Sequence, residues 1–246
     1  MTPALLAAFV IVPAALVVVA MSWMLWRART TPRSGAVAIL SGVVLAGWGG
    51  ATAILANRGV YLPPPVATLP PIGLQLLVAL GVMGLALRGS PSLRSLLTNQ
   101  TFLIRLNVWR LVGALFVALM VSGQMPAVWA LPAGLGDVLV GSTAFWVASR
   151  VHAPGGKRLA TIFNLVGLAD LVVAVGLGVT TSPPLQVFRT TPTAELITHF
   201  PLALVPGFLV PLAVMVHVVS LWQLSGRPWL ARGPEVRSAV AARSRA

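Results

Sequence analysis

Seven long apolar stretches constrain this chain more than any other feature of its sequence. A helix needs about 20 apolar residues to cross the roughly 30 Å hydrocarbon core of a bilayer. Within that core, only helices and closed barrels satisfy their own backbone hydrogen bonds. The sequence therefore predicts an all-α, polytopic integral membrane protein with seven transmembrane helices, at residues 4–26, 35–56, 71–88, 103–122, 126–149, 159–179 and 199–222.

The composition leaves little room for a water-soluble domain. Only 9% of the 246 residues are charged, whereas a soluble domain has about 25%. Residues 1–225 are expected to form one transmembrane domain, and residues 226–246 a basic cytoplasmic tail. The chain has no cysteine, which excludes disulfides, thiol nucleophiles and thiolate metal sites.

The basic residues predict how the chain is threaded through the membrane. The net charge is +13, but the positive residues form short clusters between apolar stretches, as in membrane-protein loops rather than in a nucleic-acid-binding surface. Clusters follow spans one, three, five and seven, whereas the other connections hold only Arg58 and Arg189. Because cytoplasmic loops carry the excess of Lys and Arg, we expect the N-terminus outside and the C-terminus in the cytoplasm. Sixteen arginines against one lysine, with abundant Ala and Gly, suggest a GC-rich bacterial genome, and we expect the protein in the bacterial inner membrane.

Polar residues interrupt the last four spans. Ionisable groups are costly inside a membrane, so they are functional candidates by default. Small residues that share a helix face with these polar groups predict close packing against neighbouring helices. On span four the small residues are Ala114 and Ala118, and on span five they are Gly141, Ala144 and Ala148. The candidates for a ligand or proton site are Asp137, Asp170, Arg110, Asn164, Asn107 and His217.

The charges of these candidates do not balance. Arg110 can neutralise one aspartate, and the other is then expected to carry a proton or to be balanced by a bound cation or a protonated His217. We predict that Asp170 is the structural partner of Arg110. Asp137 is the predicted exchangeable site, because Gly134 and Gly136 make its helix flexible.

The last span is expected to be kinked. Its prolines at 201, 206 and 211 each remove a helical hydrogen bond to the carbonyl four residues earlier. The carbonyls of Leu202 and Gly207 should then need other partners. A bend that serves only packing and a bend that shapes a site are both compatible with this pattern.

Three functions remain compatible with the sequence. The first is a permease-like or small-ligand-binding membrane protein with a protonatable Arg/Asp centre, whose partners would be membrane lipid and a small molecule or proton. The second is an intramembrane enzyme that acts on a lipophilic substrate, with an aspartate as general acid. The third is a structural or accessory subunit in which the charges only lock the packing. No nucleotide-binding, hydrolase or metalloprotease motif is present, and we expect neither a cofactor nor a metal.

Three segments of the second half carry a resemblance to a known group of proteins. They are LPAGLGDVLVG (131–141), FNLVGLADLVVAVGLG (163–178) and FPLALVPGFLVPLAVMVHVVSL (200–221). In them the chain resembles a family of small, uncharacterised bacterial multi-pass membrane proteins. The resemblance implies a shared fold and no particular activity.

Overall fold

The structure is a computed structural model that describes residues 2–62 and 70–226. The described residues form helices and connecting turns, with no β-strand among them. Seven helical segments are long and apolar enough to cross a membrane, which confirms the predicted all-α, seven-span class. The predicted basic tail falls almost entirely outside the described residues.

The α-helices follow one another along the chain, and three short segments between them have a different helical geometry. The α-helices are α1 (Pro3–Ala28), α2 (Pro32–Asn57), α3 (Pro71–Gly89), α4 (Pro91–Leu96), α5 (Gln100–Arg105), α6 (Gly113–Val121), α7 (Ala127–Arg150), α8 (Gly156–Thr181) and α9 (Val210–Ser225). Segments Leu106–Val112 and Ala194–Thr198 are 3₁₀-helical, and Val205–Leu209 is a π-helical turn.

Local sequence explains where several helices begin. The first four helices each start with a proline, at Pro3, Pro32, Pro71 and Pro91. Proline suits this position because its fixed φ is helical and its missing N–H would have no partner there. The Ser90 hydroxyl also caps α4 by accepting a hydrogen bond of 3.1 Å from the Leu93 amide.

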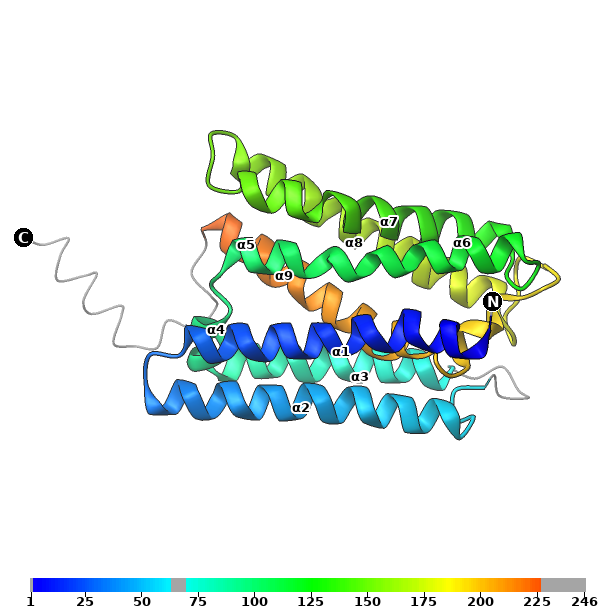
Figure 1. The fold of residues 1–246 in the computed structure, drawn as a ribbon, viewed down its shortest axis with the longest axis horizontal. Coiled ribbons are helices and arrows are strands. Elements are labelled where there is room, and N and C mark those ends of the chain that lie inside the picture. The colour runs from blue at the N-terminus through cyan, green and yellow to red at the C-terminus, as the bar shows by residue number, and fades with distance from the viewer. Residues whose placement is uncertain (1, 63–69, 227–246) are drawn as a thin grey trace, which may run out of the picture.

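The spans lie side by side along the longest axis of the molecule (Figure 1). α7 and α8 form one side of the bundle and α2 and α3 the other, with span four (α5, Leu106–Val112 and α6) and α9 between them. Spans four and seven are the most buried, and α2 and α3 are among the least buried. The core of the bundle is therefore built around the two spans that carry Arg110 and His217.

One end of the bundle collects the basic connections. The α1–α2 connection, α4 and the α7–α8 connection all lie at the end marked by α4 and α5 in Figure 1. Basic residues of these connections include Arg29, Arg94 and Lys157, whereas the opposite end has Arg58 and Arg189. The assignment of the first end to the cytoplasm stays a prediction.

Span four changes its helical phase midway. Its seven residues Leu106–Val112 have 3.0 residues per turn instead of 3.6, which rotates α6 by about 140° relative to a continuous α-helix. As a result, Gly113 is buried, whereas Ala114 and Ala118 are exposed. The prediction that these two alanines share the buried face of Arg110 is therefore wrong.

Span seven is interrupted as its prolines predicted. Regular α-helix starts only at Val210, after the π-helical turn that contains Pro206 and Gly207. Both carbonyls that were expected to lose a helical bond have other donors. The Leu202 carbonyl accepts from the Val205 amide at 2.9 Å, and the Gly207 carbonyl accepts from the Gln75 side chain at 2.9 Å.

Candidate functional site

The Arg110 guanidinium is fully buried and joins three other spans. Its Nε donates to Asp137 Oδ1 on α7 at 2.6 Å, and its Nη2 donates to Asp170 Oδ2 on α8. Its Nη1 lies 3.2 Å from both the Gly167 carbonyl oxygen and His217 Nε2 on α9. One arginine therefore pairs with both intramembrane aspartates, whereas the sequence predicted a partner for only one.

His217 acts here as a neutral acceptor. Arginine N–H groups only donate, so Nε2 of His217 must accept from Arg110. Its other nitrogen, Nδ1, lies 2.9 Å from Asn164 Oδ1. The Asn164 amide nitrogen donates to the Ala160 carbonyl and to Ser220 Oγ, both at 2.7 Å. The Asn164 Oδ1 atom is therefore the acceptor that faces His217, and Nδ1 of His217 carries the proton. This arrangement contradicts a protonated His217 as the counter-charge of an aspartate.

We name Arg110, Asp137, Asp170, His217 and Asn164 the Arg110 cluster. From it, hydrogen bonds continue toward the end of the bundle that carries α4. Ser220 Oγ accepts from Asn164 and also from the Gln100 side chain at 2.5 Å. Gln100 is the first residue of α5, so the polar chain extends from the middle of the bundle to one end of span four.

Glycines allow the helices around the cluster to approach closely. A Cβ atom added to Gly136 would lie 1.7 Å from Asp170 Oδ1, and one added to Gly167 would lie 2.4 Å from the His217 ring. A Cβ atom on Gly113 would lie 2.4 Å from the Asp137 Cβ. The buried stripe predicted for span five, with Gly141, Ala144 and Ala148, is confirmed by the burial of all three residues.

A cavity of about 100 Å³ reaches Asp137 from the opposite end of the bundle. Its lining is mainly apolar and includes the rings of Tyr61, Phe116 and Trp129. Ser182 also lines it, and its buried hydroxyl has no hydrogen-bond partner among the residues that the structure describes. Asp137 belongs to the lining and Asp170 does not, so the two carboxylates bound by Arg110 differ in their access to the cavity.

Five of the six candidate residues come together, and Asn107 does not. The Asn107 amide turns back on its own helix and donates to the carbonyls of Leu103 and Ile104, at 3.1 and 3.3 Å. Its Oδ1 is buried and has no hydrogen-bond partner within residues 2–62 and 70–226. Sequence reasoning missed Ser220 and Gln100; Ser220 was detectable as a polar residue three positions after His217, on the same face of the helix.

A second polar group stabilises the broken span seven, and we name it the Gln75 cluster. Gln75 Nε2 donates to Thr52 Oγ1 at 2.8 Å and to the Gly207 carbonyl at 2.9 Å. The Tyr61 hydroxyl donates to Gln75 Oε1. Burial raises the pKa of Tyr61, so this hydroxyl keeps its proton at neutral pH. The cluster contains no charge. Its Gln75 side chain donates to the Gly207 carbonyl in place of the backbone N–H that Pro211 lacks.

The family comparison covers the part of the chain that contains both Gln75 and the Arg110 cluster. Residues 69–225 match the model of a domain of unknown function, DUF8737. The chain belongs to the DUF8737 family. The DUF8737 region begins just before α3 and ends with α9, so α1 and α2 lie outside it. This result confirms the resemblance to an uncharacterised family, and no curated protein or solved structure matches the chain.

Proposed function

We propose that this protein is a permease-like membrane protein that binds a small ligand or a proton at Asp137. The observation that carries the proposal is the cavity that has Asp137 in its lining. A pocket with few polar groups, one of them ionisable, is the usual form of a small-molecule site. The unpaired Ser182 hydroxyl supports it, since a buried polar group without a protein partner commonly binds water or a ligand.

The size of the cavity favours a small ligand over a lipophilic substrate. An engineered cavity of about 150 Å³ holds benzene, and drug-sized ligands need roughly 300–1,000 Å³. The cavity at Asp137 has about 100 Å³, which suits a few waters or a ligand of a few heavy atoms. Its apolar, aromatic lining is the feature that an enzyme for a lipophilic substrate would have, but its volume is too small for such a substrate.

The charges support binding of a proton or a small cation at Asp137, and a polar chain connects the cluster to the other end of the bundle. With both aspartates ionised, Arg110 leaves one negative charge uncompensated next to the cavity, which attracts a proton or a small cation. Beyond Arg110, the hydrogen bonds through His217, Asn164, Ser220 and Gln100 lead toward the other end of the bundle. Gln100 Oε1 is buried and has no partner in the described part of the chain, so it offers an acceptor at the end of these hydrogen bonds.

A flux assay with a matched pair of variants tests the proposal. Protein reconstituted into vesicles that contain a pH-sensitive dye is exposed to an imposed membrane potential, and a second assay measures methylammonium uptake. We expect wild-type flux of at least one of these probes, and protein-free rates for Asp137→Asn. Asp170→Asn is the control, because it removes the same charge from Arg110 outside the cavity lining. Equal flux in the two variants, or none in the wild type, would contradict the proposal.

A cysteine pair tests the cavity independently, because the chain has no native cysteine. Ala133 lines the cavity, whereas the equally buried Ala130 does not. We expect a small cationic thiosulfonate to modify Ala133→Cys and not Ala130→Cys. Equal reactivity of both positions would argue against a specific path to Asp137.

The proposed orientation places the mouth of the cavity outside the cell. An impermeant maleimide applied to intact cells should label Val60→Cys and Gln186→Cys, and should not label Ser95→Cys near α4. The reverse pattern would invert the topology.

A structural lock is the second candidate function. It is favoured by the four hydrogen bonds around Arg110, which already satisfy most of its donors. In that case Asp137→Asn and Asp170→Asn should destabilise the protein equally, and neither should affect any flux.

A further inference from the structure

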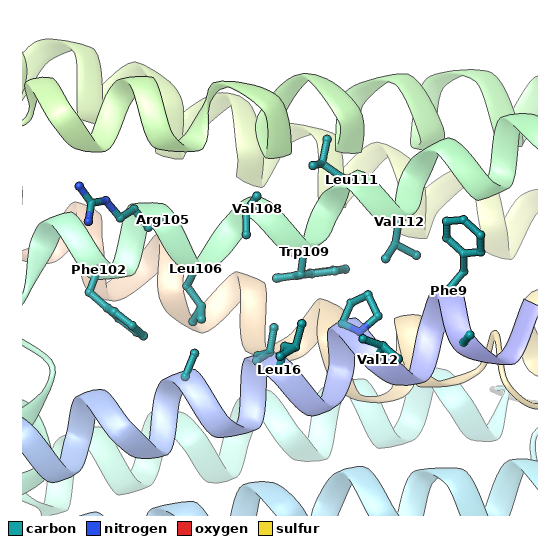
Figure 2. A pocket seen from close by; sticks show the side chains of 14 residues that line it. Phe9, Val12, Leu16, Phe102, Arg105, Leu106, Val108, Trp109, Leu111 and Val112 are labelled. Carbon is teal, nitrogen blue, oxygen red and sulfur yellow. The ribbon is translucent and has the colours of Figure 1, made fainter. Parts of the chain in front are cut away.

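A long apolar groove lies on the membrane-facing surface between α1 and span four. Its volume is about 700 Å³, and 13 of its 14 lining residues are apolar. Figure 2 shows Trp109 midway along the groove, Phe9 near one end and Arg105 at the other. This groove is separate from the Asp137 cavity, because the two share no lining residue.

Arg105 is the one charged residue of the groove, and it has no acidic partner. Its side chain is exposed and forms no ion pair or hydrogen bond within the described residues. Its only described electrostatic contact is with the Phe145 ring, whose centroid lies 6.0 Å from the guanidinium carbon. That distance is at the outer limit of a cation–π interaction, so the guanidinium keeps its capacity to bind an anion.

The depth of Arg105 suits a lipid headgroup. Arg105 lies five residues into the span that starts at Gln100, which corresponds to about 7.5 Å from its end. A long arginine side chain can reach the interface from this depth. The groove follows α1 from Ala8 to Ala20, about 18 Å of helix, which is comparable to one leaflet, or about 15 Å of hydrocarbon.

We infer that this groove binds a glycerophospholipid of the surrounding bilayer, with one acyl chain along α1 and Trp109 and the phosphate paired with Arg105. Arginine is well suited to phosphate because its planar N–H groups match the phosphate oxygens. Apart from the Trp109 indole N–H and Arg105, the lining side chains are hydrocarbon, and the groove therefore suits an acyl chain.

The charge pattern argues against a second copy of this chain as the occupant. The chain has four acidic residues. Asp137 and Asp170 are both paired with Arg110. The segment Ala194–Thr198, which contains Glu195, lies at the opposite end of the bundle from α5 (Figure 1). The fourth, Glu235, lies outside the described residues. No described carboxylate is therefore available for Arg105, and the bilayer supplies phosphates at its level.

Native mass spectrometry with a defined lipid tests this inference. Delipidated full-length protein in detergent is titrated with palmitoyl-oleoyl phosphatidylglycerol, and the affinity of the first bound lipid is measured. We expect Arg105→Gln to weaken that affinity about tenfold, as expected for the loss of a charge-assisted contact. Arg88→Gln, which removes an exposed arginine of α3 outside the groove, should leave it unchanged.

A second pair of variants fills the groove without changing charge. Val12 lines the groove and is 53% exposed, and Val172 on α8 is 72% exposed outside it. Val12→Trp should abolish the tight lipid, and Val172→Trp should retain it. An unchanged first-lipid affinity in both Arg105→Gln and Val12→Trp would overturn the inference. A wild-type dimer that Val12→Trp dissociates would overturn it too, and would identify a second copy as the occupant.

Discussion

The Arg110 cluster and the Gln75 cluster are both buried polar groups between membrane spans, yet they differ in charge and in the residue that each contributes to the cavity lining. The Gln75 cluster contributes the neutral Tyr61, and the Arg110 cluster contributes the acidic Asp137. The Gln75 cluster is neutral, and it gives the Gly207 carbonyl the donor that Pro211 cannot. The Arg110 cluster holds one positive and two acidic groups, and one of the acids lines the cavity. A neutral cluster that replaces a missing backbone bond is explained by folding alone. A cluster with unequal charges and an acidic residue in the cavity lining is what the proposed ligand or proton binding accounts for.

The largest effect is expected from Arg110→Ala. It leaves two carboxylates in the bundle interior without their cation. Removing one partner of a buried ion pair typically lowers the free energy of unfolding by about 3–5 kcal/mol. We expect little monodisperse protein and a large loss of thermal stability in detergent. Arg88→Ala, at an exposed position, should behave as wild type. If Arg110→Ala is as stable as this control, the charges of the cluster do not hold the spans together.

Gly113→Ala should also affect the Arg110 cluster strongly. The added methyl group would lie 2.4 Å from the Asp137 Cβ and 2.7 Å from the Gly134 carbonyl oxygen, so α6 and α7 must separate. Overpacking of this kind costs about 1–3 kcal/mol. Gly81→Ala on α3 is the matched control, because nothing lies within 4 Å of its added methyl group. A thermal unfolding series in one detergent compares the two, and equal midpoints would contradict the close approach of α6 and α7.

Gln75→Leu tests whether the neutral cluster acts only on folding. It removes the Gln75 donor from the Gly207 carbonyl and one of the two hydrogen-bond partners of the Tyr61 hydroxyl, and an unsatisfied buried polar group costs about 1–3 kcal/mol. We expect a lower unfolding midpoint and unchanged flux per folded molecule. Leu77→Ala, at an exposed position on the same helix, controls for changes in α3. Loss of flux without loss of stability would give the Gln75 cluster a role in function and weaken the contrast between the two clusters.

Asp137→Asn should have a smaller effect on stability, because an asparagine side chain has the same shape and still accepts a hydrogen bond from Arg110. Its effect should be seen in protonation instead. Infrared difference spectra across a pH titration are expected to lose a carboxyl band in Asp137→Asn and to keep it in Asp170→Asn. The opposite pattern would make Asp170 the exchangeable group and Asp137 the structural partner.

The smallest effect is expected for Pro211→Ala alone, since it restores an amide that can bond to the Gly207 carbonyl within the helix. Gln75 then becomes partly redundant. In the Pro211→Ala background, Gln75→Leu should cost less than half of what it costs in the wild type, as measured by a double-mutant cycle. Additive effects would show that the restored amide does not replace Gln75.

The positions of the spans could be predicted from the sequence more completely than the contacts within the site. The spans were predictable because crossing a bilayer depends on length and composition, and the predicted and observed bounds of α1, α2, α3, α7 and α8 agree within a few residues. Five of the six site candidates lie together for a similar reason, since a polar group in an apolar span must have a partner; their role as a site stays a prediction. Asn107 was the exception, because its own helix supplied that partner.

The sequence by itself determined that seven helices would form and that Arg110, Asp137 and Asp170 would lie inside them. Only the tertiary structure decided how these groups are paired and where the cavity ends. The 3₁₀ segment turned Gly113 inward instead of Ala114 and Ala118, because a pattern with a period of 3.6 cannot anticipate a local change to 3.0. Arg110 reaches both aspartates, and Gln75 reaches a carbonyl 132 residues away, because such contacts depend on how whole helices pack against each other and not on the spacing of residues along the chain.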